Sequence, residues 1–361
     1  MRRRRPVPGL VLLAVLLAVP APASAALRHA QPLVDLAPAP GARVDDRVLD
    51  RPPPALRARA AQTAGRTAVL RTSDGLPVQV TMASAYAADT SVAQSYVDFL
   101  SGLPHGSELR LLRMRIVPPE QVAGECGATE DVGVIACYLP PGNLMVVPGQ
   151  QSETGVTTAY VVAHEYGHHV ANHRSNPPFG ALDYGPKQWA SVKNVCHESL
   201  AGRLAPGDEG DLYQANPGEA WAETYARLKY PTQGGEWRYS ELLRPTRAGD
   251  FAAAADVLHP WKRSRLQTFR GRLGRFDVQD RFTFRLTLDG SLRFRLAGPR
   301  AANYDLEVRA DGHLEGRTRA PGSRDRLGWE AACVQAPETI AVTVHRRSGA
   351  GPYTLRVTSA G

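Results

Sequence analysis

The chain has 361 residues, 43% of them hydrophobic and 22% charged, a balance that excludes a disordered or fibrous protein and leaves room for about two domains. Its formal net charge of +8 falls to +4 without residues 1–25, which hold four arginines and no acid. This small excess, with no basic helix carrying interleaved aromatic residues, gives no indication of nucleic-acid binding.

Residues 1–25 have the pattern of a secretory signal peptide. Four arginines precede the apolar run Leu10–Val19, and Ala23, Ser24 and Ala25 supply small residues at its exit. The run is short for a bilayer span, and no other long apolar stretch follows. We therefore expect a secreted, extracellular protein without a stable membrane anchor after cleavage; an uncleaved anchor is the alternative.

Residues 26–66 are rich in Ala, Pro and Arg. Consecutive prolines at 52–54 exclude a regular helix or a central strand there. The composition favours a disordered spacer, and the alternative is a propeptide that masks a site further along the chain. Composition alone does not decide between the two.

Residues 67–262 alternate between strand and helix patterns. The stretch Pro77–Met82 has the period of a half-buried strand, and Val92, Tyr96 and Leu100 share one face of a helix. The expected elements are a strand at 77–82, a helix at 90–103, a strand at 109–117, a hairpin at 133–149 and further helices. This order predicts an α+β domain in which helices pack on a mixed sheet.

After residue 262 the helical pattern stops. Alternation with a period of two appears at 281–288, 291–298, 304–310, 339–347 and 352–359. Turn residues separate these stretches, so residues 263–361 are expected to form an all-β sandwich as a second domain.

The four cysteines are expected to form disulfides, because an exported chain meets an oxidising compartment. Cys126 and Cys137 bracket a short loop that the hairpin would close, and we pair them. Cys196 and Cys333 remain, and a bond between them would join the two domains; the sequence leaves that pairing open.

The stretch Val162–Asn172, VAHEYGHHVAN, places titratable groups in an apolar helix. His164 and His168 lie one turn apart, so both imidazoles point the same way and can hold one zinc ion. Glu165 is rotated by about 100° around the helix axis from His164, so it can flank the ion and act as a general base. This is the H-E-x-x-H arrangement of metalloproteases, although it also arises by chance. We interpret His169 and His173 as packing or surface residues.

A third ligand is expected from Asn216–Ala226. Asn216 is suited to cap a helix that begins at Pro217, and Glu219 and Glu223 then lie one turn apart. Glu219 also stands where a capping-box glutamate belongs. Two carboxylates on one helix face favour a nearby cation, so we prefer the ligand interpretation over the capping one.

HEYGH followed by EAWAE resembles the gluzincin zinc metallopeptidases, and the acidic helix is similar to that of the anthrax lethal factor family. The resemblance implies that Glu219 is a ligand of one zinc ion and that Glu223 supports a ligand histidine. It also implies an oxyanion-stabilising tyrosine, for which Tyr213 is the candidate. In zincins the substrate lies along an edge strand, which the hairpin would provide, unless it is a plain sheet hairpin.

The C-terminal strands, with YDLEV and GPYTLRV, resemble the jelly-roll-like bacterial pre-peptidase C-terminal domain. We therefore expect a zincin-like catalytic domain at 67–262 followed by this sandwich, acting as a secreted zinc metallopeptidase on a protein or peptide substrate. Two alternatives remain open. One is a non-catalytic zinc-binding recognition protein, and the other is a cell-wall or carbohydrate binder whose sandwich contacts a surface or glycan.

Overall fold

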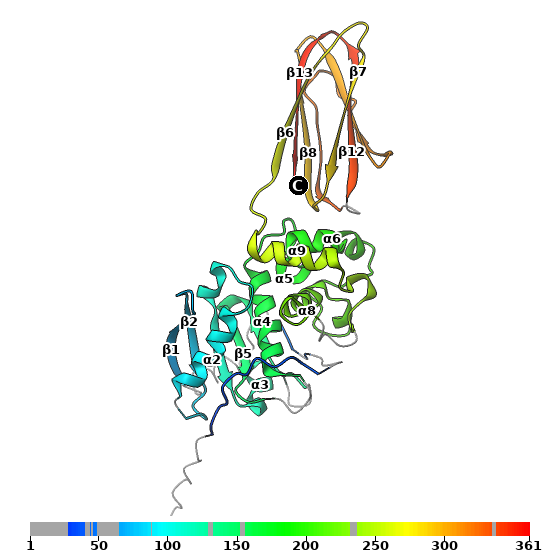
Figure 1. Ribbon diagram of the computed structural model, residues 1–361. Helices are drawn as coiled ribbons and strands as arrows, with labels where there is room; N and C mark the ends of the chain where they lie inside the picture. Colours follow the sequence, from blue (N-terminus) through cyan, green and yellow to red (C-terminus); the bar gives the residue numbers. More distant parts are fainter. Residues whose placement is uncertain are drawn as a thin grey trace, which may run out of the picture.

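The computed structural model (Figure 1) describes residues 28–39, 44, 46–48, 65–87, 89–128, 133–151, 156–231, 237–333 and 337–361. An α+β domain is followed by a β-sandwich, as the sequence predicted. The predicted signal peptide, residues 1–25, lies outside the described residues. Within the described part of the chain, no helix is long and apolar enough to cross a membrane.

A five-stranded mixed sheet forms one layer of the first domain, with the spatial order β1-β2-β3-β5-β4. The strands are β1 (Arg66–Arg71), β2 (Pro77–Met82), β3 (Arg113–Val117), β4 (Cys137–Leu139) and β5 (Leu144–Pro148). The central strands β2, β3 and β5 are parallel, whereas β1 and β4 are antiparallel to their neighbours. The predicted hairpin is thus the pair β4 and β5, and β4 is an edge strand.

Helices cover this sheet and continue toward the sandwich (Figure 1). The α-helices are α2 (Thr90–Ser101), α3 (Pro119–Glu125), α4 (Thr158–Asn172), α5 (Ala181–Tyr184), α6 (Lys187–Val192), α7 (Val195–Leu200), α8 (Pro217–Lys229) and α9 (Arg247–Leu258). Short 3₁₀ turns lie at η1 (Ser107–Leu111), η2 (Pro140–Gly142), η3 (Tyr213–Ala215) and η4 (Glu241–Leu243). The side chain of Asp89 caps α2 by accepting from the Ser91 and Val92 amides.

The predicted strand at 109–117 is partly wrong. Only β3 is extended, and the residues before it form the 3₁₀ turn η1. Leu109 and Leu112 are both buried while Leu111 is exposed. A 3₁₀ helix has three residues per turn, so this spacing places both buried leucines on the core side, which a strand would not.

The second domain consists of two four-stranded antiparallel sheets, with the orders β10-β9-β12-β7 and β11-β8-β13-β6. The strands are β6 (Arg265–Leu273), β7 (Gln279–Leu286), β8 (Gly290–Ala297), β9 (Asn303–Ala310), β10 (His313–Arg317), β11 (Arg326–Ala332), β12 (Glu338–Ser348) and β13 (Gly351–Ser359). All five predicted strands are present. In β8 and β13, buried and more exposed residues alternate, which lets each sheet turn one face inward. The strands β6, β10 and β11 were not predicted.

The predicted disulfide between Cys126 and Cys137 is present, and Cys196 and Cys333, whose pairing the sequence left open, form a second one. Cys126 and Cys137 link the end of α3 to β4, and Cys196 and Cys333 link α7 to the sandwich. The second bond therefore ties the two domains together covalently.

Hydrogen bonds join the domains beside that disulfide. The buried Lys187 Nζ donates to the carbonyl oxygen of Asp289 at 2.9 Å, and the Asp289 amide donates to Ser191 Oγ at 2.9 Å. On the sandwich side, Trp261 Nε1 donates to the Ala360 carbonyl oxygen at 2.8 Å. The sandwich thus packs on the helical side of the first domain through several specific polar contacts.

Candidate metal centre

Helix α4 carries the H-E-x-x-H residues through the core of the first domain. The side chain of Thr157 caps it by accepting a hydrogen bond from the Tyr160 amide at 3.2 Å. Every residue from 158 to 171 is buried, including the titratable ones. A helix buried all round needs partners for its polar groups, because leaving them unpaired costs roughly 2–7 kcal/mol each.

Helix α8 crosses close to α4 because of a glycine inside the motif. A Cβ on Gly167 would lie 2.9 Å from the Ala222 Cα and 3.1 Å from the Tyr225 Cβ, so a side chain there would push the helices apart. Trp221 Nε1 donates to the Gly167 carbonyl oxygen at 2.9 Å and fixes the crossing. This close approach brings Glu219 of α8 over the histidines of α4.

The start of α8 agrees with the sequence prediction. The Asn216 side chain accepts from the Gly218 amide at 3.0 Å, and Pro217 takes the first helical position. The backbone amide of Asn216 donates to Tyr213, so it is not engaged by Glu219 as a capping box would require. The Glu219 side chain is instead directed at the histidines.

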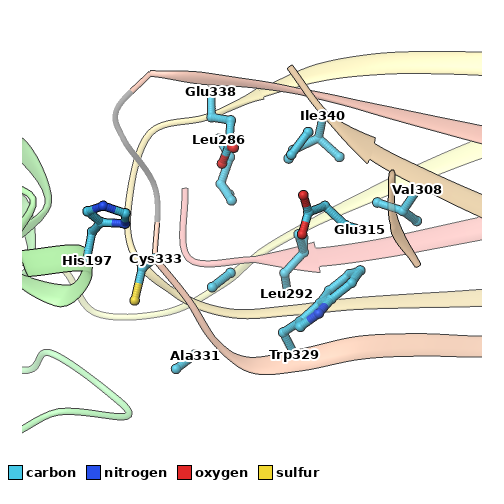
Figure 2. Close-up of a pocket in the computed structure, with 12 residues that line it drawn as sticks. His197, Leu286, Leu292, Val308, Glu315, Trp329, Ala331, Cys333, Glu338 and Ile340 are labelled. Atoms are coloured by element: carbon cyan, nitrogen blue, oxygen red, sulfur yellow. The ribbon is translucent and has the colours of Figure 1, made fainter. Parts of the chain in front are cut away.

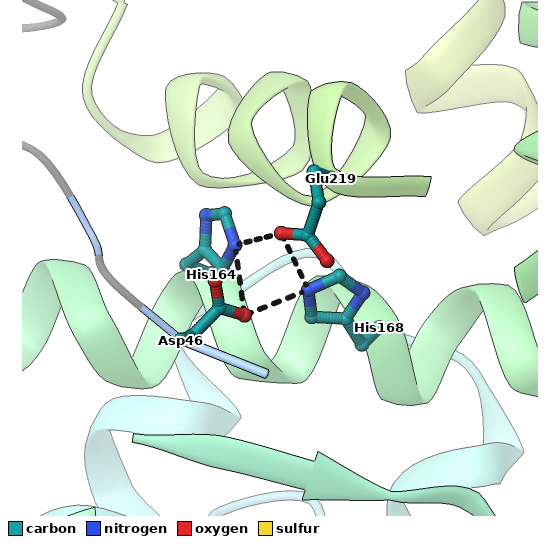
Figure 3. Close-up of side chains that lie close together, drawn as sticks. All are labelled: Asp46, His164, His168 and Glu219. Carbon is teal, nitrogen blue, oxygen red and sulfur yellow. Dashed lines mark hydrogen bonds and ion pairs between the residues drawn. The ribbon is translucent and has the colours of Figure 1, made fainter. Parts of the chain in front are cut away.

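Four buried side chains converge where α4 and α8 cross (Figure 3). His164 Nε2 lies 3.4 Å from both Asp46 Oδ2 and Glu219 Oε2. His168 Nε2 lies 3.1 Å from the same Asp46 atom and 3.5 Å from the same Glu219 atom. All four ligand atoms are within 4.8 Å of one another, and all four residues are buried. Among the described residues, these four side chains are the one group of His, Asp and Glu residues close enough together to hold a metal ion.

The spacing of these atoms fits one tetrahedral ion. Nitrogen and oxygen donors bound at 2.0–2.2 Å to a tetrahedral zinc ion stand about 3.3–3.6 Å apart. The four nitrogen–oxygen separations between the imidazoles and the carboxylates run from 3.1 to 3.5 Å. Two imidazoles also disfavour magnesium and calcium, which prefer oxygen ligands. The group can therefore bind a metal ion of the transition series or zinc.

The charges in the cluster are strongly coupled. Burial opposes protonation of His164, but the adjacent Asp46 carboxylate outweighs it and raises the pKa of His164 well above its usual value. Burial and Asp46 disfavour the charge of Glu219, yet His168 and His164 lower its pKa. The carboxylates thus require a positive charge between them, which protons on the imidazoles or a metal ion can supply.

Glu165 is fully buried beside this cluster. Neither of its carboxylate oxygens has a hydrogen-bond partner among the described residues. Burial, reinforced by the nearby Asp46 charge, raises the pKa of Glu165 well above that of a free glutamate. A buried carboxyl group without a structural partner is the type of group that moves protons in active sites.

Glu223 and Tyr213 also lie at the cluster, in different places. Glu223 Oε2 is 3.6 Å from His164 Nδ1, on the side of the ring away from the other donors, and Tyr160 donates to Glu223 Oε1 at 2.5 Å. The Tyr213 hydroxyl lies 2.5 Å from Asp46 Oδ1 and 2.9 Å from Glu219 Oε2, so it can donate to one of these at a time. Glu223 therefore lies beside the imidazole of His164, and Tyr213 contacts the carboxylates directly.

Asp46 is the member of the cluster that the sequence analysis missed. It belongs to residues 26–66, where an acidic residue among prolines and arginines has no signal that separates a ligand from a solvated charge. The structure places Asp46 with its neighbour Val44 in the domain interior, 5% and 2% exposed. These contacts differ from those of a disordered spacer. The rest of 26–66, apart from residues 28–39, 44, 46–48 and 65–66, lies outside the described residues.

The other histidines of α4 have structural partners. His169 is buried between Tyr138 OH and the Glu108 carbonyl oxygen, each 3.0 Å from one of its ring nitrogens. His173 Nε2 lies 2.9 Å from Asn143 Oδ1. Neither belongs to the metal-capable group.

A separate pocket of about 400 Å³ opens at the end of the sandwich that faces α7 (Figure 2). Most of its lining is apolar, and His197, Glu315 and Glu338 are its titratable residues. None of the four metal-capable residues lines it. Its lining brings no comparable set of donors together.

No protein-family model matches the chain, and no curated protein matches it. Among solved structures, it is similar to the pre-peptidase C-terminal domain of a collagenase from Bacillus anthracis, with 18% identity and a TM-score of 0.23 over 25% of this chain and 87% of that one. It is also similar to the Yersinia pseudotuberculosis-derived mitogen, with 14% identity and a TM-score of 0.22 over 26% of this chain and 86% of that one. A carbohydrate-binding-module domain (CBM36-1) of a xylanase from the hindgut metagenome of Trinervitermes trinervoides matches at 12% identity and a TM-score of 0.20, over 27% and 98% of the two chains. These likenesses are too partial to bear on the site.

Proposed function

We propose that the chain is a secreted zinc metallopeptidase with a zincin-like first domain. The observation that carries this proposal is Glu165, a buried carboxyl group without a hydrogen-bond partner among the described residues, beside a donor set of His164, His168 and Glu219. A site that only stored a metal ion would have no use for such a group, whose burial is costly. A site that moves protons needs it.

Each residue has a defined task in peptide hydrolysis. His164, His168 and Glu219 would hold the zinc ion, and Glu223 would keep the His164 ring in place. Zinc, when bound, would polarise the peptide carbonyl and acidify an attacking water. Glu165 would take the proton from that water and deliver it to the leaving nitrogen. The Tyr213 hydroxyl would donate to the oxygen on which negative charge develops.

The test is Glu165→Gln, which keeps the shape of the side chain and removes its ability to take a proton. We expect one zinc ion per chain to be retained, by metal analysis, and hydrolysis of casein and of a peptide library to fall by about 10²–10⁴-fold. A chelator should abolish whatever hydrolysis the parent and its Asp46→Ala form show. Because Asp46 occupies one side of the cluster, each protein is also assayed with Asp46→Ala.

The matched control is Glu241→Gln, which removes the charge of an exposed glutamate that pairs with Arg244. It should leave zinc content and hydrolysis unchanged. If the Asp46→Ala chain binds zinc but hydrolyses nothing in the library, the peptidase proposal fails.

One observation favours a second candidate, a non-catalytic zinc protein. Four protein donors surround the metal position, and structural zinc sites are closed in this way whereas catalytic sites keep one position open. If Asp46 is a permanent ligand, its removal should weaken zinc binding and destabilise the domain without creating hydrolysis. The assays above separate these outcomes.

A further inference from the structure

We propose that the N-terminal segment formed by the described residues 28–39, 44 and 46–48 is a built-in inhibitor of the metal centre, with Asp46 as a removable fourth ligand. The proposal rests on the peptidase function above and concerns how that site is regulated. In this closed form no position is left for water, so the chain is latent until the segment leaves.

Asp46 is placed as a ligand rather than as a chance neighbour. Its Oδ2 atom is the one that lies 3.4 Å from His164 Nε2 and 3.1 Å from His168 Nε2, opposite Glu219 (Figure 3). Its other oxygen accepts from Tyr213 OH at 2.5 Å. One carboxylate thus occupies the fourth corner of the donor set and also engages the tyrosine that would serve the oxyanion.

The charge balance favours this closed form. Two neutral imidazoles and two carboxylates carry a formal charge of −2, which a zinc ion neutralises. Without Asp46 the ion and its three remaining ligands would keep one positive charge, which only Glu165 beside them would offset, and an uncompensated charge in a buried site is costly. The aspartate therefore stabilises the loaded site while it blocks it.

The residues after Asp46 cover the edge of the sheet. Val48 pairs with Tyr138 of β4 as a parallel bridge, and the Tyr138 amide donates to the Arg47 carbonyl oxygen at 3.1 Å. The Val48 amide donates to Glu209 Oε2 at 3.1 Å. β4 is the edge strand of the hairpin expected to pair with an extended substrate, so substrate and segment compete for the same backbone groups.

Residues 28–39 hold the segment on the domain by dispersed contacts. The Gln31 amide donates to Gly149, the Leu33 amide to Ser95, Thr157 to the Leu36 carbonyl oxygen and Tyr230 to Asp35. The cysteines that pair are 126 with 137 and 196 with 333, so neither disulfide reaches the segment. The attachment is non-covalent apart from the chain itself, and one cut after residue 48 would leave nothing covalent to retain it.

The experiment compares the full chain with Asp46→Ala and Asp46→Asn, each loaded with zinc or cobalt(II). Asp98→Asn is the matched control, because it changes an exposed aspartate of α2 that accepts from Gln94 and contacts neither the segment nor the metal centre. The readouts are zinc transfer to a chromophoric chelator, the cobalt absorption spectrum with and without azide, and hydrolysis of the peptide library.

We expect both Asp46 variants to release zinc at least ~10-fold faster than the parent. Loss of a residue that merely supports a metal ligand already lowers metal affinity about 10–100-fold, and Asp46 is placed as a ligand itself. Azide should change the cobalt spectrum of these variants and leave the spectra of the parent and of Asp98→Asn unchanged, because only an open position accepts it. Hydrolysis should rise at least ~10-fold once water can enter.

The outcomes distinguish the two proposals. If azide binds the Asp46 variants and zinc leaves faster but nothing is hydrolysed, Asp46 is the closing ligand and the peptidase function is wrong. If zinc release and the azide response match those of the parent, the inhibitor proposal is overturned, whatever the hydrolysis. It is also overturned if hydrolysis falls in Asp46→Asn while thermal unfolding shows an intact fold.

Discussion

The two domains of this protein differ in what they bury. The sandwich interior consists of apolar side chains from two facing sheets, and a buried acid such as Asp305 is paired, in its case with Arg347 at 2.6 Å. The first domain buries two histidines and three carboxyl groups at one crossing of helices, including Glu165, whose oxygens have no partner among the described residues. Buried ionisable groups cost stability, so their concentration in one domain indicates where chemistry takes place.

The largest expected effect comes from removing a ligand. His164→Ala should lower zinc affinity by more than about 100-fold, beyond the 10–100-fold typical of residues that only support a ligand. Calorimetry should then show the unfolding transition of the first domain at lower temperature while that of the sandwich stays in place. His313→Ala, in the exposed strand β10, is the control. Equal shifts in both domains, or full zinc retention, would contradict the assigned site.

A smaller effect is expected from Gly167→Ala. In an isolated helix this change would stabilise the helix by roughly 1 kcal/mol. Here, however, the added Cβ would lie 2.9 Å from the Ala222 Cα, and this backbone atom can move away only if the whole of α8 shifts. Overpacking costs about 1–3 kcal/mol, so we expect a net loss of stability and weaker zinc binding, measured by chemical denaturation and metal titration.

The control for this variant is Gly274→Ala in the sandwich, where a Cβ meets nothing within 4 Å. It should be nearly neutral. A gain of stability in Gly167→Ala would mean that helix propensity dominates and that the two helices are not held as closely as described.

The smallest expected effect is a pH dependence at the boundary between the domains. Burial lowers the pKa of Lys187 to about 8, although Asp289 and Asp256 oppose the shift. Because the folded pKa lies below the unfolded value of about 10.4, the unfolded chain binds more protons between these values. The contribution of Lys187 should therefore raise the free energy of unfolding as the pH increases from about 8 toward 10. This contribution should be lost as the pH falls through 8.

Lys187→Met should flatten this rise, measured by denaturation at several pH values. Lys262→Met, at an exposed position, should keep the slope of the parent. An unchanged slope in Lys187→Met would show that this amine is not desolvated where the domains meet.

The helices that carry the site could be predicted because their signals are local. Asn216 and Pro217 mark the start of α8, and the period of 3.6 residues places His164 and His168 on one side of α4. The five predicted sandwich strands alternate with a period of two. The 3₁₀ turn η1 was missed because the apolar run at 109–117 is typical of a strand, and only packing against the core shows that Leu109 and Leu112 lie on the same side.

The sequence by itself determined the pair of imidazoles, the neighbouring Glu165 and the acidic helix, because fixed spacing on a helix fixes direction. Only the tertiary structure decided how close Glu219 lies to His164 and His168, since that distance depends on the contact of Gly167 with α8. It alone brought Asp46 to the same point, from more than a hundred residues away. No periodicity encodes such a meeting, because it depends on where the chain packs after its elements have formed.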